Sequence, residues 1–225
     1  MRIDERKIEL TVFDMWKSVS VLKAILIFVS FTVLSFGNMT VFIALGIVVL
    51  LLACYMAFRQ GQGIGHEACS VSSSIRHIGQ QPGRADQIDD KMYRQAFSVS
   101  NGVKSILAGG LIGYLVNSVY IACMLLKAPE GVQLGTRMAS FVVSIGYWPI
   151  VVHWHELFNV LTPDIVAVLM AGPFLLPVCQ FAGYLQGPKL WEKTEKAMAE
   201  GKRRAKARSR IGRKKNAPKI RKPEI

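Results

Sequence analysis

Residues 39–58 read MTVFIALGIVVLLLACYMAF, an uninterrupted run of 20 residues without a charged side chain. A helix needs about 20 apolar residues to cross a hydrocarbon core roughly 30 Å thick. Similar runs occupy residues 19–36, 105–126 and 165–185, and among these three only the first contains a charge, Lys23. A soluble protein could bury one such helix but hardly four. The sequence therefore predicts an all-α integral membrane protein with four transmembrane helices.

The charged residues are concentrated towards the C-terminal end of the 225-residue chain. Residues 189–225 hold 15 Lys and Arg against four acids, which gives +11 of the total net charge of +13 and leaves +2 for the rest. A soluble basic domain would spread its charge over a surface. This pattern instead indicates an almost neutral apolar body followed by a basic tail, residues 188–225.

A fifth apolar stretch, residues 138–155, is shorter than the other four, and Pro149 interrupts its last part. Proline removes a helical hydrogen bond and bends or ends a helix. The stretch can therefore cross as a short helix, or enter the membrane and return on the same side. Backbone that does not cross is tolerated at membrane depth where protein or water covers its polar groups.

The distribution of Lys and Arg favours the re-entrant alternative and leaves the crossing one open. Basic residues flanking membrane helices stay on the cytoplasmic side. Four crossings with a re-entrant fifth segment put residues 1–18, 59–104 and 188–225 on that side, whereas five crossings would leave the first two outside. We therefore predict that both ends are cytoplasmic and that residues 19–58 form a hairpin turning at Gly37-Asn38.

The predicted cytoplasmic loop, residues 59–104, carries its own helix signals. Ile88, Met92 and Ala96 are spaced by four, which places them on one side of an amphipathic helix running towards the third membrane segment. Three glycines at the start of the loop are interpreted as a flexible exit from the second membrane helix: Gly61, Gly63 and Gly65.

Potential metal-binding and catalytic residues occur in this loop, but they form no complete set. His66 and Cys69 are one helical turn apart and could share an ion only with ligands from elsewhere. His66 and His77 would lie about 16 Å apart on a helix, too far to bind the same ion. The pattern predicts a polar surface helix without a metal or cofactor.

A second group, His153, His155 and Glu156, lies at the end of the fifth apolar stretch. HELFN resembles half of the zinc-protease motif H-E-x-x-H, but Asn159 stands where the second histidine is required. The neighbouring Trp148 and Trp154 favour an interfacial aromatic belt. An ion-linked or proton-linked site at the two histidines and Glu156 is the alternative.

Small and polar residues inside the third membrane segment predict close helix packing. Gly109, Gly113 and Asn117 are spaced by four and therefore form one stripe. Small residues let a second helix approach, and the asparagine can hydrogen-bond across the contact.

The fourth long run contains Pro173, Pro177 and Gln180, which make a candidate polar site in the membrane because prolines free backbone carbonyl groups. Lys23 lies near the start of the first run, where we expect it to extend to the membrane surface. No Asp or Glu lies in the four runs, which disfavours an ion-coupled transporter.

The tail suits anionic lipid, because Lys and Arg near a membrane surface each gain about 1 kcal/mol from an anionic leaflet. RNA or ribosome contact is the alternative, although after Trp191 the tail contains no aromatic residue that could stack on bases. The predicted lipid-binding residues are Lys202, Arg203, Arg204, Lys206, Arg208, Arg210, Arg213, Lys214 and Lys215.

Together these features predict a multi-pass membrane protein in which no complete catalytic set is recognisable; a membrane enzyme that uses Cys69 and His66, or the group of His153, His155 and Glu156, is the weakest of three hypotheses. The leading hypothesis is a non-catalytic scaffold or accessory subunit that engages a protein partner, or a second copy of itself, and anionic lipid through its loop and tail. The alternative is a small transport or channel component that uses Asn117, Gln180 and the proline-bent helix.

Overall fold

The computed structural model describes residues 10–81, 83, 88–150 and 161–215. All regular structure within these residues is helical. In chain order the elements are α1 (Leu10–Leu34), α2 (Met39–Gly79), α3 (Asp90–Gln95), α4 (Val99–Leu125), α5 (Glu130–Ser144), the 3₁₀ helix η2 (Ile145–Ile150), α6 (Pro163–Tyr184) and α7 (Gly187–Lys215).

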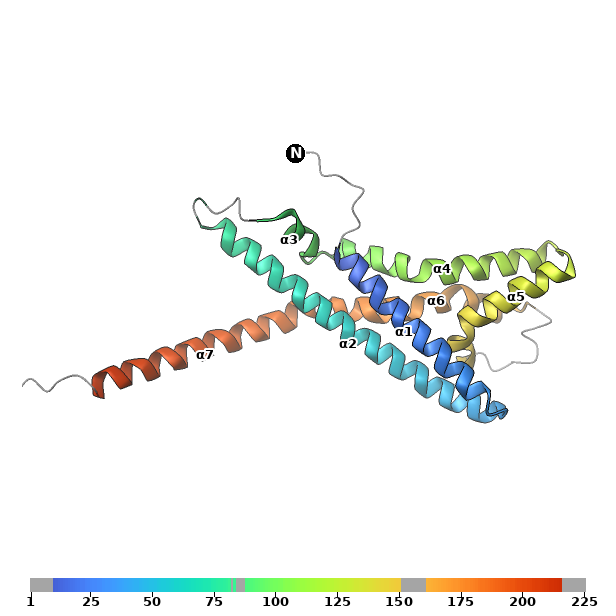
Figure 1. The fold of residues 1–225 in the computed structure, drawn as a ribbon, viewed down its shortest axis with the longest axis horizontal. Helices are drawn as coiled ribbons and strands as arrows, with labels where there is room; N and C mark the ends of the chain where they lie inside the picture. Colours follow the sequence, from blue (N-terminus) through green and yellow to red (C-terminus); the bar gives the residue numbers. More distant parts are fainter. Residues whose placement is uncertain (1–9, 82, 84–87, 151–160, 216–225) are drawn as a thin grey trace, which may run out of the picture.

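Four helices, α1, α2, α4 and α6, carry segments long and apolar enough to cross a membrane. This confirms the predicted all-α architecture and its four candidate spans. In the bundle, α2 and α6 run in one direction and α1 and α4 in the other (Figure 1). The bundle exposes large apolar side chains on all four helices, for example Phe28, Leu51, Leu107 and Val178.

The turn between α1 and α2 lies at the predicted Gly37-Asn38 pair. Gly37 has a φ of +70°, a conformation that costs glycine little because it has no Cβ. The Asn38 side chain accepts a hydrogen bond from the backbone N–H of Val41, 3.2 Å away, and so caps the first turn of α2.

The second helix extends far beyond the end expected from hydropathy. α2 continues to Gly79, so the glycines at 61, 63 and 65 lie inside a helix, and the prediction of a flexible exit is wrong. Hydropathy falls after Phe58 because the run of apolar residues ends there. The helix itself can continue, since the sequence contains no proline before Pro82. A helix of 41 residues is about 60 Å long, roughly twice the thickness of a hydrocarbon core.

The predicted amphipathic helix through Ala96 is much shorter than expected. α3 has six residues, and Ala96 is already extended, with φ −63° and ψ 150°. Neighbouring helices hold the next residues in an extended conformation: the Phe97 N–H donates to Ser72 Oγ at 2.9 Å, and the Ser98 N–H donates to the Tyr184 hydroxyl at 3.0 Å. These tertiary bonds replace the helical bonds that the spacing predicted.

The fifth apolar stretch is divided between two elements. α5 begins at Glu130, eight residues before the predicted start at 138, and η2 follows it directly. Figure 1 shows α5 running back from the α4–α5 turn into the bundle. Tyr147 of η2 is buried in the central core with Leu22 of α1, Leu50 of α2 and Leu176 of α6. η2 therefore forms part of the core of the bundle.

Candidate functional site

The predicted stripe on α4 packs against the two prolines of α6. A Cβ at Gly109 would lie 2.9 Å from Pro177 Cγ, and a Cβ at Gly113 would lie 2.9 Å from Pro173 Cβ. Only glycine leaves room for the proline rings at these positions. The two helices are antiparallel. Gly109, the earlier glycine of α4, therefore faces the later proline of α6, and Gly113 faces the earlier one.

Asn117 hydrogen-bonds the carbonyl that Pro173 leaves free. A proline has no N–H, so Pro173 cannot donate to Leu169 O, its normal helical partner. The Asn117 Nδ2 group donates to Leu169 O at 2.5 Å. Asn117 is fully buried, and its Oδ1 atom accepts hydrogen bonds from Ser140 Oγ at 2.8 Å and Ser144 Oγ at 3.2 Å. The side chain thus connects α4, α5 and α6.

Lys23 has the same role one turn further along α6. Pro177 cannot donate to the carbonyl of Pro173, and Lys23 Nζ donates to that oxygen at 2.8 Å and to Gly109 O at 2.6 Å. α1 begins at Leu10, so Lys23 lies near the middle of the helix, and its ammonium group turns into the bundle. The expectation that Lys23 extends to the membrane surface is therefore wrong.

Gln180 is almost completely buried and joins a third set of polar contacts. Its Nε2 group donates to Ser18 Oγ on α1 at 3.2 Å, and the Ser18 hydroxyl in turn donates to Gln60 Oε1 on α2. We call the polar side chains of these three sets of contacts the polar seam: Ser18, Lys23, Gln60, Asn117, Ser140, Ser144 and Gln180. The seam runs through the bundle and connects five of its helices.

A second set of glycines lets α2 approach the junction of α6 and α7. A Cβ at Gly65 would overlap the Tyr184 carbonyl oxygen, and a Cβ at Gly187 would overlap the backbone of Gly65. Gly61 and Gly183 make equally close backbone contacts across the same interface. These four residues, the glycine crossing, form two small-x-x-x-small pairs on parallel helices. The sequence shows the four-residue spacing of both pairs, but the prediction of a flexible exit at Gly61 and Gly65 misses the contact.

Beyond the glycine crossing, α2 and α7 diverge and form a cleft of about 590 Å³. The His66 ring packs edge-on to Trp191 with ring centroids 5.3 Å apart, and its Nε2 atom lies 3.2 Å from Thr194 Oγ1 on α7. Within the described residues no three His, Cys, Asp or Glu side chains gather as metal ligands. The residues that line the cleft are Cys69, Ser72, Ser73, Arg76, His77, Gln80, Phe97, Pro188, Trp191 and Glu195.

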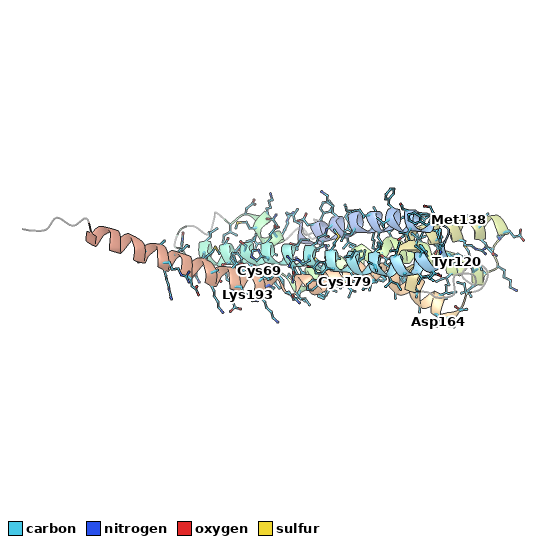
Figure 2. All side chains as sticks on the ribbon, turned by 90° about the horizontal axis from the view of Figure 1, so that it is seen from below. Cys69, Tyr120, Met138, Asp164, Cys179 and Lys193 are labelled. Atoms are coloured by element: carbon cyan, nitrogen blue, oxygen red, sulfur yellow. The ribbon has the colours of Figure 1, made fainter. Side chains whose placement is uncertain are left out.

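α7 extends away from the bundle as one long helix (Figures 1 and 2). The Lys196 ammonium donates a 2.6 Å hydrogen bond to Glu192 and holds the pKa of that carboxyl below its ordinary value. Further along, Lys202, Arg203, Arg204 and Lys206 are exposed. The remaining predicted tail residues, from Arg208 to Lys215, lie on the helix backbone, but their side chains are outside the described part.

The predicted ion or proton site of His153, His155 and Glu156 lies outside the described residues. Comparison of the chain with protein-family models, with curated proteins and with solved structures finds no match.

Proposed function

We propose that this protein is a non-catalytic membrane scaffold or accessory subunit whose extended helices α2 and α7 bind a partner on the cytoplasmic side. The observation that carries the proposal is α7, a helix of 29 residues that leaves the bundle with exposed basic side chains. The glycine crossing fixes the base of α7 against α2. Rigid attachment of this kind suits a helix that must present charges at a defined distance from the membrane.

The reach of α7 favours a protein partner over lipid of the same membrane. Lys202 is 15 residues beyond Gly187, which is about 22 Å along a helix. Charges in physiological salt are screened beyond about 8 Å. α7 continues away from the bundle in Figure 1, so if the membrane surface lies across its base, the basic end is outside the range of an anionic leaflet. Lipid binding by the tail requires α7 to bend towards the membrane near Leu185 and Gln186.

We infer four crossings, with α5 and η2 re-entrant. The C-terminal end of α4 and the N-terminal end of α6 lie at the same end of the bundle, opposite α7, which supports an even number of crossings. α5 spans only about 22 Å in its 15 residues. Its buried residues are Ser140 and Ser144, whereas Leu134 and Met138 are exposed. A helix that turns its polar residues towards the protein and its apolar residues outward is typical of contact with lipid.

Transport is the second candidate because two backbone carbonyls beside the polar seam lack a helical donor, and transporters use such carbonyls to bind ions. In this bundle Lys23 and Asn117 already occupy those carbonyls. A solute could reach them only if both side chains moved away. The seam therefore supports a structural role better than a transport site.

Purification from native membranes tests the proposed function. We expect a protein partner to co-purify in stoichiometric amount with the wild type and to be lost when Lys202 and Arg203 are both replaced by Gln. The matched control replaces Lys189 and Lys193, two exposed cations near the base of the same helix, and should retain the partner. A wild type that purifies without a stoichiometric protein, or equal loss in both variants, would contradict the proposal. Loss of anionic lipid alone would instead support lipid binding by the tail.

A further inference from the structure

Arg137 of α5 is a charged side chain that points into the protein and has no anionic partner among the residues that the structure describes. Its Nε atom is buried and has no hydrogen-bond partner. Nη2 lies 3.9 Å from Met124 Sδ, a weak acceptor, and the Tyr120 hydroxyl is the other polar group beside the guanidinium. Among the described residues no carboxylate oxygen lies within 4 Å of it.

A buried guanidinium without an anionic partner lowers the stability of a protein that has no ligand bound there. Charged groups inside membrane proteins are rare and generally pair with one another or with backbone carbonyls. Lys23 follows this rule through two carbonyls, but Arg137 does not. The guanidinium carries five N–H donors in a planar fork, so the contacts to Met124 and Tyr120 leave most of its hydrogen-bonding capacity unused.

The surroundings indicate which ligand would use that capacity. Arg137 lies two turns into α5, at the end of the bundle opposite α7, where Figure 2 also shows Tyr120 and Met138. Leu134 and Met138 on α5 are exposed, and so is Leu126, which directly follows α4. A guanidinium with an apolar surface beside it can bind a phosphate through paired hydrogen bonds while acyl chains lie on the leucines.

We propose that Arg137, assisted by the Tyr120 hydroxyl, binds a phosphate group on the side of the membrane opposite α7. The phosphate belongs to a phospholipid headgroup or to a small soluble phosphate, and both use the same donors. This site is separate from the basic tail and does not depend on the proposed partner of α7.

The test measures thermal unfolding of the full-length protein, purified in a phosphate-free detergent, during three titrations. The ligands are short-chain phosphatidylglycerol, inorganic phosphate and a diacylglycerol with the same chains but no phosphate. We expect phosphatidylglycerol to raise the Tm and diacylglycerol to raise it much less. A similar increase with inorganic phosphate would identify a soluble phosphate as sufficient. An unchanged Tm with both phosphate ligands, or an equal effect of diacylglycerol, would overturn the proposal.

Two substitutions connect the effect to the residue. In Arg137→Gln the apparent affinity for the phosphate ligand should fall about tenfold or more, the expected loss when a charged hydrogen-bonding partner is removed. Lys127→Gln removes the same charge from an exposed turn at the same end of the bundle and should bind as the wild type does. Equal weakening in both variants would show a general charge effect and contradict the assignment.

If Arg137→Gln does not fold, Arg137→Lys provides the comparison, because it keeps the charge but lacks the planar fork. Its affinity should also fall. Native mass spectrometry of the wild type gives an independent result: one retained phospholipid or phosphate per chain supports the site, and none contradicts it.

Discussion

At the scale of single residues, the interior of this protein depends on side chains that hydrogen-bond proline-freed carbonyls. In the membrane no water is available for a carbonyl that has lost its helical donor, so another group must bind it. Asn117 and Lys23 supply that group for Leu169 and Pro173. The prolines can bend α6 because two neighbouring helices carry matching donors.

The stripe on α4 and the prolines of α6 could be recognised in the sequence from their spacing. The direction of Lys23 could not, because α1 is apolar on every side and periodicity does not show which side faces the bundle. Hydropathy could not predict where α1 begins either, since residues 10–18 mix apolar and charged side chains. A prediction from the apolar run alone, residues 19–36, therefore places Lys23 near a helix end.

Chemical labelling tests the position of Lys23. A water-soluble amine-reactive reagent should modify the exposed Lys17 in the folded protein and leave Lys23 unmodified, because its ammonium is bound to two carbonyl oxygens inside the bundle. Denatured protein, in which both amines should react, is the control. Peptide mass spectrometry gives the result at each position. Equal modification of both lysines in the folded protein would mean that Lys23 reaches the membrane surface.

At the scale of elements, the glycine crossing determines how α2 and α7 leave the helix bundle. Two glycines of α2 and one each of α6 and α7 bring the backbones into contact, and beyond this point α2 and α7 diverge around a cleft. Hydropathy could not predict the length of α2, because hydropathy shows where apolar residues end and not where the helix ends. The small-x-x-x-small spacing was the signal that could have identified the contact.

Two alanine substitutions separate packing from helix propensity at this crossing. Gly65→Ala should lower the free energy of unfolding by about 1–3 kcal/mol, the usual cost of overpacking, because the new Cβ would overlap the Tyr184 carbonyl. Gly63→Ala in the same helix meets nothing within 4 Å and should stabilise by about 0.5–1 kcal/mol through helix propensity. Thermal unfolding in detergent compares the two. Equal shifts of the same sign would show that α2 and α7 do not touch there.

At the scale of the whole molecule, we propose that four helices cross the membrane while α5 and η2 enter and leave from one side. The four apolar runs were sufficient to predict the spans. They could not show that α5 starts in the link before the fifth run, because Glu130 and Arg137 make this amphipathic helix look like a surface segment. Its polar side faces Asn117, and only the tertiary structure reveals that contact.

Cysteine accessibility tests this claim most directly. Single cysteines are introduced at Ser74, Gly131 and Gly201, which are all exposed, after replacement of Cys54, Cys69, Cys123 and Cys179. With a membrane-impermeant thiol reagent on intact cells, we predict labelling at position 131 and protection at positions 74 and 201, with all three labelled after permeabilisation. Labelling at position 74 with protection at position 201 would place α2 and α7 on opposite sides of the membrane and contradict the four-crossing topology.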